Sequence, residues 1–175
     1  MVSLVSRTGR QYQRYNMGGC RQVVGCIPYR FKNDFEELEV LVISSQKGQG
    51  MLFPKGGWET DESKEEAALR ETLEEAGVVG KVEGELGKWS FKSKRHGTFY
   101  EGYMFPLLVK EQLDSWPEES LRSRKWMNVE DAREVCQHSW MKEALDVLVH
   151  RLTHSRRQVN ENDDDEELVV PCSLN

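Results

Sequence analysis

Hydrophobic residues fall into several short runs separated by polar loops, a pattern typical of a sheet covered by helices. The runs at 22–29 and 38–44 have the aliphatic and β-branched content of central strands, and a short strand is expected at 51–53. Residues 81–91 and 98–109 flank a basic turn and predict a hairpin, and one more short strand passes through Trp126 and Met127. These patterns alone predict an α/β or α+β fold.

Two helices are expected near the end of the chain. Asn128, followed by Asp131 three residues later, predicts a short helix that ends near Cys136, and a last helix begins at Ser139. Apolar residues recur at helical spacing in that last helix: Trp140, Ala144, Leu145, Leu148, Val149 and Leu152. We expect this face to pack on the sheet as part of the core.

A third helix is predicted within the stretch GGWETDESKEEAALRETLEEAGV, residues 56–78. Ser63 and Glu66 have the S-x-x-E spacing of a reciprocal N-terminal cap. Gly77 lies where a helix C-terminus favours a residue that adopts left-handed backbone angles. The helix is therefore expected to run from about Ser63 to Ala76.

Acidic residues are crowded on this helix. Glu71 and Glu75 are four residues apart and share one face, and Glu74 lies one turn beyond Arg70. Such carboxylates repel one another unless a positive charge lies between them, and Mg²⁺ prefers oxygen ligands that include a few carboxylates and substrate phosphates. Gly56 would let the backbone approach such an ion closely. The pattern favours a metal site over the alternative, a solvated face of a surface helix.

The spacing G-x5-E-x7-R-E-x2-E-E-x-G is specific, with its fixed points at Gly56, Glu62, Arg70, Glu71, Glu74, Glu75 and Gly77. It resembles the signature box of the Nudix hydrolases, which cleave diphosphates linked to a further group. The resemblance implies an α/β/α sandwich with a mixed β-sheet and a Mg²⁺ cofactor, for which Mn²⁺ can substitute.

The same resemblance assigns roles to the box residues. It implies that Glu71 and Glu75 bind metal, and that Glu74 binds metal or acts as the base. It implies that Arg70 orients the glutamates through charge-assisted hydrogen bonds, and that the carbonyl near Gly56 completes the site.

Segments outside the box resemble one branch of this family, the diphosphoinositol polyphosphate phosphohydrolases, which also cleave diadenosine polyphosphates. The similarity runs from about Arg21 to Leu148 and includes PKGGWE, KRHGTF and RKWMNVEDA. It departs at Lys55, where some relatives have glycine, and at Trp140, where a lysine is expected. The candidate substrate contacts, all but Lys55 by matched position, are Arg21, Ser44, Ser45, Lys55, Lys94, Arg95, His96 and Arg122.

We therefore expect Mg²⁺-dependent hydrolysis of a phosphoanhydride bond, with an inositol pyrophosphate as substrate. The first alternative is a diadenosine polyphosphate or another nucleoside diphosphate derivative, such as ADP-ribose or NADH, which would need aromatic faces such as Tyr12, Tyr15, Trp58 or Phe99. The second is a non-catalytic module that senses its ligand. RNA cap hydrolysis is disfavoured because no continuous basic strip is evident, and the basic turn at 94–96 is also compatible with a plain solvated loop.

Composition limits the organisation of the chain. With 175 residues and a net charge of −6, one domain is expected at 19–157, between a basic arm at 1–18 and a disordered acidic tail at 158–175. No apolar run is long enough to span a bilayer, so we expect no membrane partner. We also expect no nucleic-acid partner and a monomeric protein. The four cysteines lack zinc-site spacing, which favours the cytoplasm or nucleus, while the arginines of the arm leave a mitochondrial transit peptide as an alternative.

Overall fold

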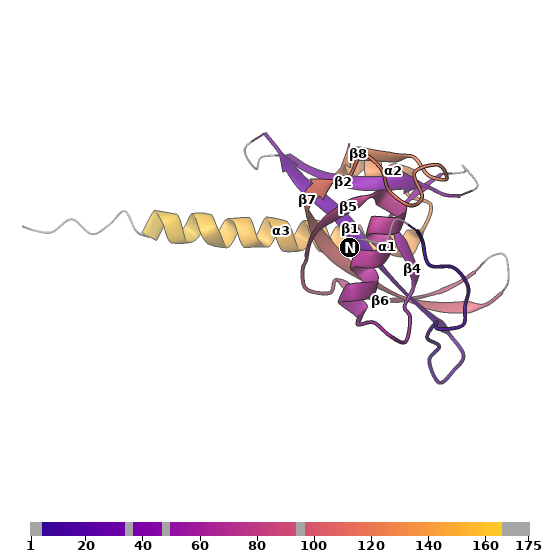
Figure 1. Ribbon diagram of the computed structural model, residues 1–175. Coiled ribbons are helices and arrows are strands. Elements are labelled where there is room, and N and C mark those ends of the chain that lie inside the picture. The colour runs from indigo at the N-terminus through magenta and orange to yellow at the C-terminus, as the bar shows by residue number, and fades with distance from the viewer. Residues whose placement is uncertain (1–4, 34–36, 47–49, 94–96, 166–175) are drawn as a thin grey trace, which may run out of the picture.

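Eight strands form one mixed sheet in the computed structural model, which describes residues 5–33, 37–46, 50–93 and 97–165 (Figure 1). The strands are β1 (Arg21–Lys32), β2 (Glu37–Ser44), β3 (Met51–Leu52), β4 (Lys55–Gly57), β5 (Val78–Val82), β6 (Gly87–Lys92), β7 (Phe99–Gln112) and β8 (Arg124–Asn128).

Strand β1 lies at the centre of the sheet. It runs parallel to β7 and antiparallel to β2 and β4, in the order β3-β2-β1-β7-β5, while β6 pairs with β7 and β8 pairs with β2. Its residues 23–29 are buried, which explains why this segment reads as a nearly continuous apolar run. The pairing of β4 with β1 fixes the glycines that precede the acidic helix against the middle of the sheet.

Three helices accompany the sheet: α1 (Lys64–Ala76), α2 (Val129–Val135) and α3 (Ser139–Asp165). The mixed sheet with its helices confirms the predicted α/β fold class. The apolar face predicted for the last helix is confirmed at its N-terminal half, where Trp140, Ala144, Leu145 and Leu148 are buried. None of the helices in the described part of the chain is long and apolar enough to cross a bilayer.

The segment predicted as one strand at 81–91 forms parts of two strands. Strand β5 ends at Val82 and β6 begins at Gly87, and both pair with the long strand β7. Between them the N–H groups of Glu83 and Leu86 donate to carbonyls of β7 at 2.9 and 2.8 Å. The predicted hairpin is therefore formed by β6 and β7. The first part of the predicted strand belongs to β5 instead, and β7 is long enough to pair with both.

The predicted boundary at Gln158 does not coincide with a helix end. Helix α3 continues to Asp165, whereas the sequence predicts disorder from Gln158 onward. No glycine or proline interrupts residues 139–165, and extending an existing helix adds one backbone hydrogen bond per residue without a new nucleation cost. The helix leaves the body of the domain in Figure 1, and residues 166–175 lie outside the described part of the chain.

The described part of the basic arm is ordered against the domain. Gln13 forms an isolated β-bridge with Glu59, and Tyr15 forms one with Arg21. The N–H of Arg14 donates to the carbonyl of Trp58 at 2.9 Å. Of the alternatives for this arm, the structure therefore shows an ordered one from residue 5 onward.

Candidate active site

The acidic helix α1 has both of its predicted caps. The Ser63 hydroxyl accepts from the N–H of Glu66 at 3.1 Å, and the Glu66 carboxylate accepts from the N–H of Ser63 at 3.4 Å. Gly77 has φ 65° and its N–H donates to the carbonyl of Leu73 at 3.1 Å. These caps fix where the helix begins and ends, and so fix which of its carboxylates face the protein.

Arg70 joins the carboxylates of the helix to the loop before it. Its guanidinium donates to both oxygens of Glu62, at 2.9 and 2.7 Å. It also donates to Glu71 at 2.8 Å, to Glu74 at 3.4 Å and to the carbonyl of Gly57 at 2.9 Å. One guanidinium, of a side chain that is 14% exposed, thus holds three of the box glutamates in place, which is the geometry expected of an orienting residue.

Arg122 holds the other side of the cluster. Its Nη2 lies 3.1 Å from Oε1 of Glu75, and its Nε lies 3.3 Å from Oε1 of Glu118. Its Nη1 donates to the carbonyl of Ser44, at the end of β2, at 3.1 Å. The N–H of Lys55 donates to the second oxygen of Glu75 at 3.1 Å, so both oxygens of that carboxylate are engaged.

Burial makes the ionised form of these carboxylates costly. Burial, together with repulsion from Glu75, raises the pKa of Glu71 to about 8. Burial likewise raises the pKa of Glu75 to about 7, although Arg122 and Lys55 oppose the shift, and burial also raises the pKa of Glu74. Groups with such shifts gather where extra positive charge is to be bound, so this donor set fits a hard divalent cation.

The backbone at Gly56 leaves room for this cluster. A Cβ at this position would lie 2.1 Å from Cδ of Glu71, so only glycine allows the strand to approach the carboxylate. No group of three or more His, Cys, Asp or Glu side chains within the described ranges is gathered closely enough to hold a metal by itself. Mg²⁺ sites in proteins combine one or two carboxylates with several waters and substrate phosphate.

Several of the predicted substrate residues lie beside these carboxylates. Lys55 is within electrostatic reach of Glu71 and Glu75 as well as of Arg21 and Arg122, and its burial lowers its pKa. Nε of Arg21 is buried with no hydrogen-bond partner in the structure, and its guanidinium lies 5.7 Å from the ring centre of Tyr100. Arg21, Lys55 and Arg122 thus form a set of cations around the acidic cluster, which we call the cationic rim.

The other predicted substrate residues have different surroundings. The hydroxyl of Ser44 accepts from the N–H of Ser123 at 2.9 Å, and the N–H of Ser45 donates to the carbonyl of Gly50 at 3.1 Å. Ser44 is the last residue of β2 and its carbonyl accepts from Arg122, and Ser45 follows it in the chain. Lys94, Arg95 and His96 lie outside the described residues. Trp140, which departs from the related branch, is buried and stacks on Phe91 with ring centres 4.6 Å apart.

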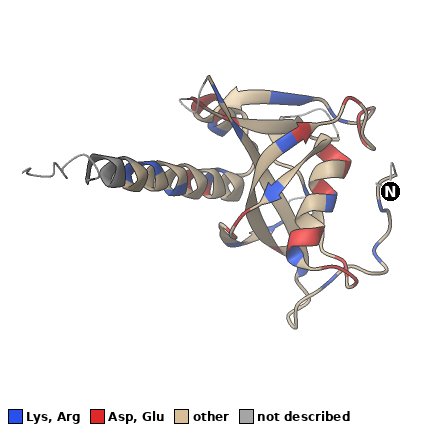
Figure 2. Cartoon of the chain, turned by 60° about the vertical axis from the view of Figure 1, so that its left-hand side comes forward, with Lys and Arg blue, Asp and Glu red and all other residues tan. Residues whose placement is uncertain are grey.

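Glu118 belongs to this cluster, although sequence analysis did not single it out. It is 7% exposed, its N–H donates to the carbonyl of Glu74 at 3.0 Å, and its carboxylate pairs with Arg122. The only sequence signal is its spacing of four residues from Arg122, which is common among surface ion pairs and therefore not specific. Figure 2 shows the acidic residues carried along α1 and in the neighbouring loops.

Comparison with known proteins shows the family of this chain. A family model described as the NUDIX domain matches residues 20–152. Nudix hydrolase 17, mitochondrial, from Arabidopsis thaliana is 66% identical over 166 residues, which cover 92% of this chain and 91% of that protein. Diphosphoinositol polyphosphate phosphohydrolase 2 from Mus musculus is 37% identical over 130 residues, which cover 73% of this chain and 69% of that protein.

Solved structures show the same fold. The Ap4A hydrolase of C. elegans in a binary complex aligns with a TM-score of 0.64 and 20% identity, covering 76% of this chain and 98% of that one. Nudix hydrolases in general depend on a divalent metal ion such as Mg²⁺, and the buried carboxylates described above fit one. The family model and the close relative together show that this chain belongs to the Nudix hydrolase family.

Proposed function

We propose that this Nudix hydrolase cleaves a phosphoanhydride bond in an inositol pyrophosphate and that Mg²⁺ is its cofactor. The observation that carries the proposal is the cationic rim of Arg21, Lys55 and Arg122 around the buried box carboxylates. A substrate with phosphates on every side of a small ring needs positive groups from several segments, and these three come from β1, β4 and the loop before β8.

The residues divide the chemistry between them. Glu71 and Glu75, joined by Glu74 where it is not the base, would hold the cation, which when bound would withdraw charge from the phosphoryl oxygens. Arg70 keeps Glu71 and Glu74 oriented through the hydrogen bonds described above. Glu74, or Glu118 outside the box, accepts the proton of the attacking water, because both carboxylates lie at the cluster and are buried. The cationic rim neutralises the leaving phosphate group.

The mouse relative supports the inositide substrate, since its name describes cleavage of diphosphoinositol polyphosphates. The C. elegans neighbour favours the second candidate, a diadenosine polyphosphate, and exposed rings at Tyr12, Tyr15 and Phe99 are available to stack on bases. The name of the Arabidopsis relative supports mitochondrion as the location among the alternatives.

The experiment is a substrate panel measured with purified protein and Mg²⁺. We expect kcat/KM for an inositol pyrophosphate to exceed the values for diadenosine polyphosphate, ADP-ribose and NADH. Arg122→Ala should lower the value for the inositide by about 10- to 100-fold, because it removes a charge-assisted contact of about 1.5–3 kcal/mol, and should lower the others less. Arg133→Ala serves as the matched control, because Arg133 is exposed on α2 and pairs with Asp146.

Two results would overturn parts of this proposal. If a diadenosine polyphosphate or ADP-ribose has the highest kcat/KM, and Arg122→Ala lowers kcat/KM equally for every substrate, the substrate is a nucleotide and not an inositide. Ligand binding without turnover of any member of the panel would favour the non-catalytic sensor.

A further inference from the structure

The described start of the N-terminal arm lies directly on the candidate metal site. We propose that residues 5–8, here called the strap, close the acidic cluster in the metal-free protein and must leave it when the metal and its phosphate substrate bind. This inference rests on the proposed metal site, and it adds a competing ligand that is part of the same chain.

Residues 9–16, which follow the strap, are held on the domain by several hydrogen bonds. In residues 9–16, the N–H of Arg14 donates to the carbonyl of Trp58, and the carbonyl of Tyr12 accepts from the N–H of Thr60 at 2.7 Å. The guanidinium of Arg14 donates to the carbonyls of Glu59 and Thr60, each at 3.1 Å, and lies 4.3 Å from the ring centre of Trp58. This part of the arm is therefore held by main-chain contacts that do not involve the cluster.

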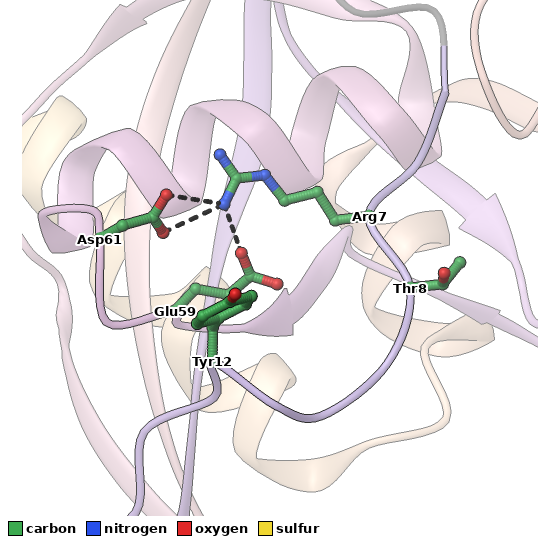
Figure 3. Close-up of a pocket in the computed structure, with 5 residues that line it drawn as sticks. All are labelled: Arg7, Thr8, Tyr12, Glu59 and Asp61. Atoms are coloured by element: carbon green, nitrogen blue, oxygen red, sulfur yellow. Dashed lines mark hydrogen bonds and ion pairs between the residues drawn. The ribbon is translucent and has the colours of Figure 1, made fainter.

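The strap itself is held by the cluster and by the loop next to it. The N–H of Arg7 donates to Oε1 of Glu74 at 3.1 Å, and the hydroxyl of Ser6 donates to Oε2 of Glu118 at 3.3 Å. The guanidinium of Arg7 pairs with Glu59 and, at 3.1 Å, with Asp61 (Figure 3). These hydrogen bonds and ion pairs of Ser6 and Arg7 are thus all made to carboxylates.

These contacts occupy carboxylate oxygens of Glu74, the expected metal ligand or base, and of Glu118, the other candidate base. Glu74 and Glu118 are adjacent, because the N–H of Glu118 bonds to the carbonyl of Glu74. A neutral N–H and a hydroxyl satisfy such carboxylates when no metal is present, but a divalent cation is the stronger partner for both. The strap therefore occupies carboxylate oxygens beside Glu71 and Glu75 that the metal or its bound water would otherwise contact.

The packing under the strap is open enough to let it move. A cavity of about 540 Å³ lies between the strap and the loop that leads to α1. Its lining consists of Arg7, Thr8, Tyr12, Glu59 and Asp61, shown in Figure 3. The guanidinium of Arg7 reaches across this cavity to Glu59 and Asp61, so these ion pairs help to hold the strap in place.

The test compares Arg7→Ala with Arg10→Ala, an exposed arginine on the same arm whose loss changes the net charge equally. Mn²⁺ binding is measured by titration calorimetry with no substrate present. We expect Arg7→Ala to lower the Kd for Mn²⁺ by roughly three- to tenfold, because the strap loses its ion pairs with Glu59 and Asp61 and holds the cluster less tightly, and Arg10→Ala to leave the Kd unchanged. A variant that lacks residues 2–8 should show at least the effect of Arg7→Ala.

A second readout follows the strap directly. Trypsin cleavage after Arg7 should become several-fold faster when Mn²⁺ and pyrophosphate are added to the wild-type protein, because the strap leaves the cluster. Unchanged or weaker Mn²⁺ binding in Arg7→Ala would overturn the proposal, as would slower cleavage on metal addition. Neither readout needs turnover, so a failure of the inositide assignment would leave this test intact.

Discussion

Arg70 and Arg122 hold the same acidic cluster from two sides, and they differ in how far along the chain their partners lie. The partners of Arg70 lie within 13 residues of it, inside the signature box. Two partners of Arg122, Glu75 and Ser44, are 47 and 78 residues away. The Arg70 half of the cluster is therefore determined locally, while the Arg122 half exists only when the sheet has formed.

This difference indicates what each arginine is for. Arg70 donates all of its N–H groups to protein oxygens, including both oxygens of Glu62, so its role is to hold the carboxylates of the site in position. Arg122 is the member of the cationic rim that lies on a loop, and it contacts Glu75, which also accepts from the N–H of Lys55. We infer that loss of Arg70 affects stability and every substrate alike, whereas loss of Arg122 affects substrate choice.

The largest expected effect is on stability, and it tests this division. Arg70→Ala should lower the free energy of unfolding by about 3–5 kcal/mol, because it leaves several buried carboxylates without their partner. Arg122→Ala should cost less, since Glu75 keeps the N–H of Lys55. Denaturant melts of both variants at pH 7 measure this. Equal losses of stability would show that Arg70 and Arg122 stabilise the fold to the same extent, and would contradict this division of roles.

The local half of the site is also the half that the sequence could predict. Caps, helix limits and the shared face of Glu71 and Glu75 follow from spacing within 56–78, and the structure confirms the caps. Glu118 and the strap could not be found this way, because their positions depend on a loop and an arm that the sheet brings to α1. The split between β5 and β6 was missed for the same reason, since only the length of β7 reveals it.

The next effect compares two glutamates of one helix. Glu75→Gln should lower kcat by at least about a hundredfold, because a lost metal-ligating charge removes several kcal/mol of transition-state stabilisation. Glu66→Gln is the matched control: Glu66 lies on the exposed first turn of α1, and its cap is worth about 1 kcal/mol of stability. Single-turnover rates with excess Mg²⁺ are the measurement. Near wild-type turnover in Glu75→Gln would refute its place in the metal site.

The smallest effect is a pH dependence of stability that distinguishes the two halves. Burial raises the pKa of Glu71 in the Arg70 half to about 8, further than it raises that of Glu75, to about 7. The folded state therefore holds protons that the unfolded chain releases, so the stability these groups contribute is present at low pH and is lost as pH rises toward 8. Without metal, the free energy of unfolding should therefore fall from pH 5 to pH 8.

Metal should reverse this dependence, because a bound cation requires ionised carboxylates and so favours the deprotonated folded state at high pH. Thermal melts from pH 5 to pH 8, with EDTA or with excess Mg²⁺, measure both slopes. Glu71→Gln should flatten the slope in EDTA more than Glu75→Gln does, since the pKa of Glu71 is shifted further. A metal-free protein equally stable at both pH values would show that the cluster stays ionised and that Arg70 and Arg122 alone neutralise it.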